Sequence, residues 1–140
     1  MNPREQKPPW TTTHTNVVHA WMCGHYGHMN VRHYAHLFDD ASWAMWSLFG
    51  VSTRHMQQQG VRTVVASTNT TFVKELLPGT VVVVESRFVR LGTKSVTYEQ
   101  RLLDVDTGQE HARQEATEVF VDDETRASTR IPTAIRALLA

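Results

Sequence analysis

An apolar pattern with helical spacing in the first third of the chain limits the possible folds more than any other feature. The pattern alternates steps of three and four through Val31, Tyr34, Phe38, Ala41, Met45 and Leu48. Only a helix aligns such a series on one face. Asn30 can cap this helix and Gly50 can end it. Because aromatic residues widen its apolar surface beyond a stripe, we expect a central helix surrounded by protein.

The rest of the chain is mostly rich in Val, Thr, Phe and Tyr, which is typical of strands. Five strands are expected, with turn residues between the later ones: Trp10–Cys23, Val61–Leu77, Thr80–Leu91, Ser95–Val105 and Glu110–Val121. Short connections predict antiparallel neighbours. A short terminal helix is expected from Pro132 to Leu139. This order predicts an α+β fold with one helix against one face of a curled antiparallel sheet.

Composition narrows the class of protein. A chain of 140 residues with 41% apolar side chains suits one domain, so we expect a single domain over residues 10–140 after a flexible, proline-rich segment at 1–9. Fourteen basic and fourteen acidic side chains cancel, which favours neither nucleic acid nor a membrane as a partner. The single cysteine, Cys23, excludes an internal disulfide. We expect a soluble, cytoplasmic protein.

A known family is suggested by the segment that leads into the helix. Gly27-His28-Met29-Asn30, followed by Tyr34 and Phe38-Asp39-Asp40-Ala41, resembles the signature of the hot-dog acyl-CoA thioesterases, the group of the 4-hydroxybenzoyl-CoA thioesterases. The resemblance implies that the sheet wraps the helix and that copies join edge to edge as a homodimer or homotetramer. It also implies that an acyl-CoA thioester binds at the subunit interface. Coenzyme A is then part of the substrate, and no separate cofactor is expected.

The usual catalytic carboxylate of that group is missing here. The resemblance places an aspartate three residues before Gly27, where this chain has Gly24. Three explanations stay open: a neighbouring group has taken the role, another carboxylate faces the site, or the protein binds acyl-CoA without hydrolysing it. His25 can activate water near neutral pH and is the leading candidate, with Asp39 on the helix as the second. Cys23 is more simply explained as a small apolar side chain.

Thioester hydrolysis also needs hydrogen-bond donors for the oxygen that gains negative charge. The first N–H groups of a helix are unpaired, so the backbone N–H groups of Asn30 and Val31 are candidates. The predicted substrate contacts are residues of the turn, one helix tryptophan and three cations for the phosphates of coenzyme A: Gly24, Tyr26, His28, Trp43, Arg90, Lys94 and Arg130.

Histidines three residues apart, His25 with His28 and His33 with His36, have a spacing that metal ligands can share. No cysteine pair accompanies them, and we expect no metal site. His36 can instead pair with Asp40 one turn later. Most of four aromatic residues near the site are expected to be core or dimer contacts, and a cage that some of them form for a cationic acyl group is a narrower alternative: Trp21, Tyr26, Trp43 and Trp46.

Overall fold

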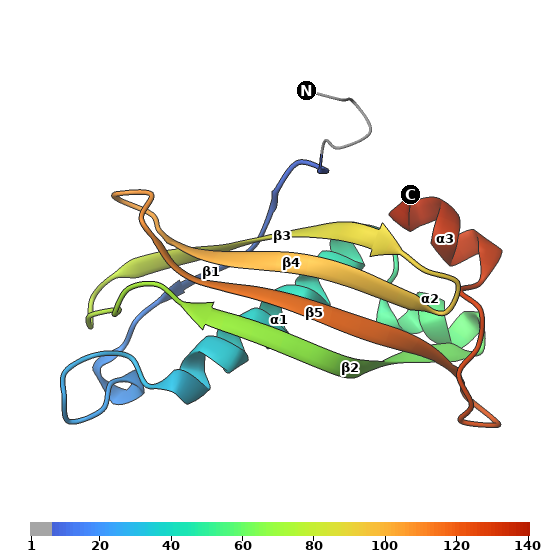
Figure 1. Ribbon diagram of the computed structural model, residues 1–140, viewed down its shortest axis with the longest axis horizontal. Coiled ribbons are helices and arrows are strands. Elements are labelled where there is room, and N and C mark those ends of the chain that lie inside the picture. The colour runs from blue at the N-terminus through green and yellow to red at the C-terminus, as the bar shows by residue number, and fades with distance from the viewer. Residues whose placement is uncertain (1–6) are drawn as a thin grey trace.

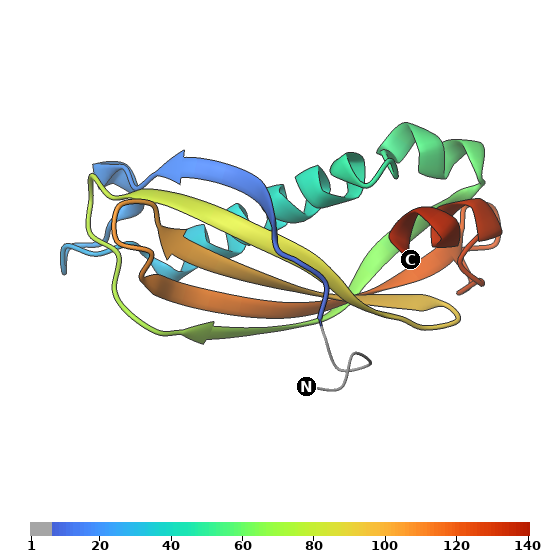
Figure 2. The same cartoon turned by 90° about the horizontal axis from the view of Figure 1, so that it is seen from above.

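The computed structural model describes residues 7–140. An antiparallel five-stranded sheet curls over one side of a long helix, α1 (Val31–Leu48) (Figures 1 and 2). The order across the sheet is β1 (Thr11–Val17), β3 (Val81–Leu91), β4 (Ser95–Asp104), β5 (Glu110–Asp122) and β2 (Val61–Phe72). The predicted α+β hot-dog architecture is therefore confirmed, and β1 and β2 are the two edges of the sheet.

The helix α1 follows the sequence prediction at both ends. The Asn30 side chain accepts a hydrogen bond from the Arg32 N–H at 3.3 Å, and Gly50 takes a left-handed φ of 84° just beyond the helix, a conformation that glycine adopts without strain. The face toward the sheet is buried, whereas Trp43 and Leu48 on the other side are 60% and 61% exposed. The prediction that protein surrounds this helix is therefore wrong for the single chain.

Several element boundaries differ from the predictions. The first strand ends at Val17, because the chain then turns into a short 3₁₀ helix, Ala20–Met22. β2 stops at Phe72 rather than Leu77. A short helix, α2 (Thr53–Gln58), was not predicted; the Ser52 side chain caps it by accepting a hydrogen bond from the His55 N–H at 3.1 Å. The predicted terminal helix is present as α3 (Thr133–Leu139).

A row of buried and half-buried polar side chains crosses the sheet from edge to edge, and we call it the polar belt. It contains one residue from each strand, linked by hydrogen bonds of 2.7–3.5 Å: Thr13, Ser86, Gln100, Gln114 and Thr70. Gln100 lies between Tyr98 and Leu102, which belong to different apolar clusters of the core. Its side-chain amide also donates to the Phe38 carbonyl at 2.8 Å. The belt therefore divides the core and ties the sheet to α1 next to Asp39.

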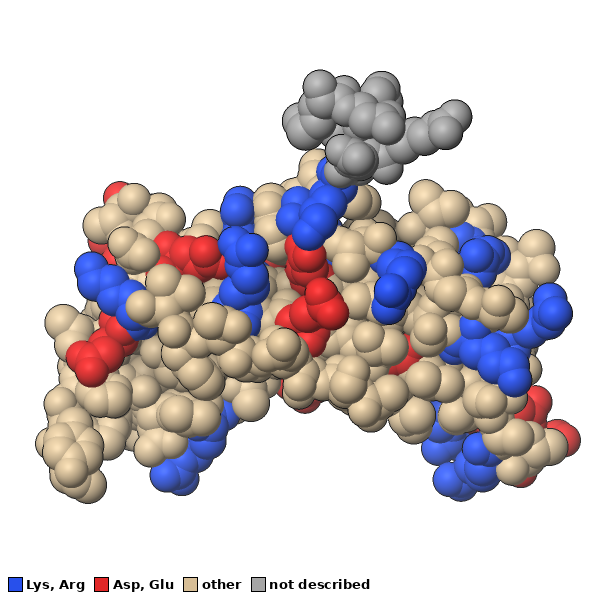
Figure 3. Space-filling model, in the orientation of Figure 1, with Lys and Arg blue, Asp and Glu red and all other residues tan. Residues whose placement is uncertain are grey.

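The outer face of the sheet carries charges of both signs (Figure 3). Glu99 accepts from Lys7 at 2.6 Å and from Arg87 at 2.8 Å, and Trp10 packs against Arg87. Burial alone would raise the pKa of Glu99, but Lys7 and Arg87 outweigh burial and hold this pKa below its usual value. Of the segment predicted to be flexible, residues 1–6 lie outside the described residues.

Candidate functional site

A tight turn precedes α1 and presents the first group of predicted site residues. The Gly24 N–H donates to the His28 carbonyl at 3.1 Å, and the Gly27 N–H donates to the Gly24 carbonyl at 2.9 Å. Gly27 has a left-handed φ of 85°, which explains why glycine stands there. His25 and Tyr26 are exposed at the tip of the turn, with ring centroids 4.5 Å apart.

The first turn of α1 has fewer available donors than predicted. The Asn30 N–H donates to the Met22 carbonyl at 2.9 Å, because Cys23 and Met29 form an isolated β-bridge that brings these segments together. The prediction of Asn30 as an oxyanion donor is therefore wrong. Among residues 7–140, the Val31 N–H has no acceptor. The Val31 N–H thus stays available to bind a negatively charged oxygen.

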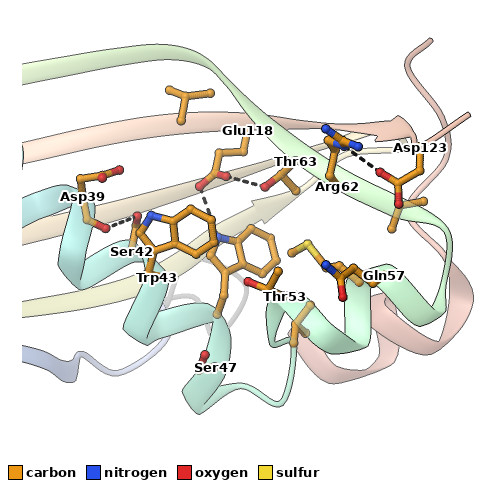
Figure 4. Close-up of a pocket in the computed structure, with 15 residues that line it drawn as sticks. Asp39, Ser42, Trp43, Ser47, Thr53, Gln57, Arg62, Thr63, Glu118 and Asp123 are labelled. Carbon is orange, nitrogen blue, oxygen red and sulfur yellow. Dashed lines mark hydrogen bonds and ion pairs between the residues drawn. The ribbon is translucent and has the colours of Figure 1, made fainter. Parts of the chain in front are cut away.

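Two adjoining cavities lie between α1 and β2, and we call them together the α1–β2 groove. The cavity of about 610 Å³ lies along the first half of α1, and the cavity of about 460 Å³ lies along its second half (Figure 4). Asp39, Ser42 and Val65 line both of them. Most of the residues that line them are polar or charged, and apolar side chains such as Trp43 and Val65 complete the walls. Small ligands bind in concave sites that combine apolar surface with converging polar groups.

Asp39 is the predicted catalytic residue that lies in this groove. It is exposed, and its backbone carbonyl accepts a hydrogen bond from the Ser42 hydroxyl at 2.7 Å. Its neighbour Asp40 lines only the larger cavity, and the Asp40 carboxylate lies 3.0 Å from His36 Nε2. The predicted His36–Asp40 pair is therefore confirmed. Of the two aspartates, Asp39 is the one whose carboxylate has no ion-pair partner among residues 7–140.

Glu118 on β5 was not predicted from the sequence. It is 6% exposed, lines the smaller cavity, and accepts from Trp46 Nε1 at 3.2 Å and from the Thr63 hydroxyl at 2.7 Å. Figure 4 shows Glu118 and Thr63 from the sheet facing Trp43 and Ser42 from α1. Burial raises the pKa of nearby Tyr98, and the Glu118 carboxylate raises it further. Tyr98 therefore stays protonated.

The predicted cations for coenzyme A do not line either cavity. Arg90 donates to the Thr97 hydroxyl at 3.2 Å and Lys94 to the Ser128 hydroxyl at 3.5 Å. Arg90, Lys94 and Arg130 lie near the β3–β4 turn, at the end of the molecule opposite the start of α1 (Figure 1). The basic residues that do line the cavities, Arg32 and Arg62, were not predicted.

The remaining predicted residues are divided between the two regions. Trp43 lines the smaller cavity together with Trp46. Trp21 and Tyr26 are exposed near the turn and line neither cavity, so of the four aromatic residues only Trp43 and Trp46 share a cavity. His28 Nε2 lies 3.7 Å from Glu75.

The histidines do not gather into a metal centre in the part of the chain that the structure describes: no three His, Cys, Asp or Glu side chains are placed there to hold an ion. The His33 pKa is lowered, first by burial and then by the nearby Arg32 and His36. None of the helices within residues 7–140 is long and apolar enough to cross a membrane.

Comparison of the sequence with models of protein families identifies the family of this chain. Residues 17–139 match the model of the thioesterase-like superfamily. The chain belongs to this superfamily. Among curated proteins, no sequence matches this thioesterase-like chain.

Solved structures resemble this thioesterase-like chain over most of its length. The protein SAV2348 from Staphylococcus aureus, solved in complex with CoA, is 20% identical, with a TM-score of 0.83 over 96% of this chain and 85% of that one. Slr0204, a 1,4-dihydroxy-2-naphthoyl-CoA thioesterase from Synechocystis, is 12% identical, with a TM-score of 0.80 over 91% and 94%. PA2801 from Pseudomonas aeruginosa, a candidate thioesterase, is 27% identical, with a TM-score of 0.76 over 93% and 100%.

Proposed function

We propose that this protein hydrolyses the thioester of a small acyl-CoA to a free acid and coenzyme A. The observation that carries the proposal is Asp39, a carboxylate without an ion-pair partner in residues 7–140, on the wall of the α1–β2 groove. Membership of the thioesterase-like superfamily supports the reaction class. The CoA complex of SAV2348 supports the ligand class.

The proposed chemistry uses two groups of the chain. The Asp39 carboxylate accepts a proton from a water molecule, and the oxygen of that water attacks the thioester carbonyl carbon. The Val31 N–H donates to the carbonyl oxygen as it becomes negative. The carbon–sulfur bond then breaks, and the thiolate of coenzyme A takes up the proton. We prefer Asp39 to His25 as the base because Asp39 lines both cavities of the α1–β2 groove, whereas the His25 ring packs against Tyr26 at the tip of the turn.

Two copies of the chain are needed to bring these groups to one carbonyl. Val31 and Asp39 are eight residues apart in α1, which is about 12 Å along the helix axis. The edge strand β2 exposes Val64, Val65 and Phe72. An exposed apolar edge strand tends to pair with a strand of another chain. Antiparallel pairing of β2 with its copy about a two-fold axis sets the two α1 helices in opposite directions. The first turn of one helix then faces Asp39 of the other.

The proposed assembly is thus a homodimer joined through β2. Further pairing to a homotetramer and a cytoplasmic location stay predictions. Size-exclusion chromatography with light scattering of the wild type and a Val65→Lys variant tests the dimer. The wild type should elute as a dimer or tetramer, and the buried charge should shift the variant toward the monomer. A wild-type protein that is monomeric at assay concentrations would contradict the shared site.

A thiol-release assay over short, aromatic and cationic acyl-CoA esters tests the reaction. We expect release of the coenzyme A thiol from at least one ester in proportion to enzyme concentration. A purified, folded dimer that releases no thiol from any ester of the panel would contradict the proposed hydrolysis.

The second candidate function is binding of acyl-CoA without hydrolysis. Gly24 favours it, since the carboxylate expected from the family resemblance is absent there. An acyl-CoA ester that raises the melting temperature of the protein without release of thiol would support the binding function. Turnover of the same ester would exclude it.

A further inference from the structure

Glu118 combines deep burial with an opening to a cavity. It lies on β5 with only 6% of its surface exposed, yet it lines the cavity of about 460 Å³ in the α1–β2 groove. Its two carboxylate oxygens accept from neutral donors, Trp46 Nε1 at 3.2 Å and the Thr63 hydroxyl at 2.7 Å. These hydrogen bonds orient the carboxylate but do not neutralise a negative charge.

No cation of the described chain compensates Glu118. Among residues 7–140, Glu118 forms no ion pair with a Lys, Arg or His side chain. The one basic residue on the wall of the same cavity, Arg62, donates to Asp123 at 2.7 Å instead. Asp39 places a second carboxylate on this wall. Buried charges in proteins are normally paired, so these two carboxylates favour a ligand that carries a positive charge.

The same cavity offers aromatic surface. Trp43 and Trp46 both line it, and Trp43 is 60% exposed. Cations are attracted to the faces of tryptophan rings, most strongly where water is excluded. The volume of about 460 Å³ lies within the range of roughly 300–1,000 Å³ that small-molecule sites occupy. Carboxylate and tryptophan together select an organic cation over an anionic or purely apolar group.

We propose that this cavity binds an ammonium group, quaternary or protonated, with Glu118 as its counter-charge and Trp43 as an aromatic wall. On the proposed function, to which this step adds the substrate class, the cation belongs to the acyl part of the CoA thioester. Of the four aromatic residues considered from the sequence, Trp43 and Trp46 line the cavity, and the β5 carboxylate of Glu118, which was not predicted from the sequence, lines it with them.

Binding of a charged probe and its uncharged isostere tests the proposal without turnover. Choline and 3,3-dimethylbutan-1-ol have the same shape, and only choline is charged. Isothermal titration of the wild-type protein should show choline bound about tenfold more tightly. Equal affinities, or no binding of choline at millimolar concentration, would overturn the proposal.

Two variants, Glu118→Gln and Trp43→Leu, test which side chains cause the preference for choline. In Glu118→Gln the amide oxygen can still accept from Trp46 and the amide nitrogen can donate to the Thr63 hydroxyl, so the fold is kept while the charge is lost. The preference for choline should then fall to within about twofold. The matched control is Glu115→Gln, an exposed carboxylate on the same strand, which should keep the preference. A Glu118→Gln protein that still prefers choline would reject Glu118 as the counter-charge.

The exposed tryptophan gives a test that does not depend on a core substitution. Trp43→Leu should weaken choline binding about fivefold and change the affinity for the neutral probe much less. An unchanged choline affinity would reject the aromatic wall. Failure to release thiol from any acyl-CoA would contradict the proposed hydrolysis while leaving the choline preference in place. Turnover without charge preference would contradict only this inference.

Discussion

The start of α1 and the middle of the α1–β2 groove differ in where their residues come from. At the start, the turn and the first helical residues all belong to one short segment, from Gly24 to Arg32. In the middle, Trp46 of α1 meets Glu118, 72 positions later in the sequence. The start of α1 has the Val31 N–H as a donor but no carboxylate at position 24. The middle of the groove has the carboxylates of Asp39 and Glu118. The chemistry expected at one place is thus divided between two regions.

Removal of the Asp39 charge should lower activity more than any of the other substitutions. Unchanged activity would mean that the middle of the groove does not supply the catalytic base. Asp39→Asn keeps the size of the side chain but cannot accept the proton of water, so kcat should fall roughly 100-fold or more with KM changed little. Steady-state thiol release measures both constants. The control Asp40→Asn changes the adjacent carboxylate, which is paired with His36, and should stay within a few-fold of the wild type. Equal losses in both variants would remove Asp39 from its proposed role.

A carboxylate placed at the start of α1 should give the next largest effect. A Cβ at Gly24 has only the Asn30 side chain within 4 Å, at 3.9 Å, so a side chain fits there. Gly24→Asp in the Asp39→Asn background should raise thiol release about tenfold, because it places a carboxylate next to Asn30 at the start of α1. Gly24→Asn serves as the uncharged control. No gain in the aspartate variant would show that the start of α1 lacks more than a carboxylate.

Removal of the α1 cap tests whether the start of the helix matters for activity as well as stability. Asn30→Ala should lower the free energy of unfolding by about 1 kcal/mol, measured by urea denaturation, and also reduce thiol release. Ser52→Ala removes the cap of α2 and should cost a similar free energy with activity unchanged. If the two variants lose activity equally, the effect of Asn30 comes from stability alone.

The smallest expected effect is on the pH dependence of folding stability, to which His33 near the start of α1 contributes. The pKa of His33 is lowered in the folded protein, so the unfolded chain binds the proton more readily. Stability is therefore complete above the unfolded pKa of about 6.5 and declines as pH falls through the lowered folded pKa. Urea denaturation from pH 8 to pH 5 should show a smaller acid-side decline in His33→Gln. An identical decline in the variant would assign it to other groups.

The predictable parts of the molecule are those set by local sequence. The 3.6-residue periodicity placed α1 within a residue of its ends, because the pattern, the Asn30 cap and the Gly50 stop act in one segment. α2 has six residues, too few for a periodic pattern to be seen. The end of β2 depends on its pairing with β5, which the composition of β2 alone does not reveal.

The same distinction separates the parts of the site. Asp39 and Trp43 could be selected because they lie on the predicted helix. Glu118 could not, since its burial depends on β2 and α1 closing over β5. The error at Asn30 has a similar cause: its N–H is occupied by the Met22 carbonyl, a contact made by a chain reversal that the strand prediction for Trp10–Cys23 did not contain.

The polar belt has a consequence for how this protein can acquire a new specificity. Thr13, Ser86, Gln100, Gln114 and Thr70 separate the residues packed under the start of α1 from those around Trp46. Substitutions in separate packing units contribute almost independently to stability. The half around Trp46, which lines the proposed ammonium cavity, can therefore accumulate changes of size and polarity while the half that positions the Val31 amide keeps its geometry.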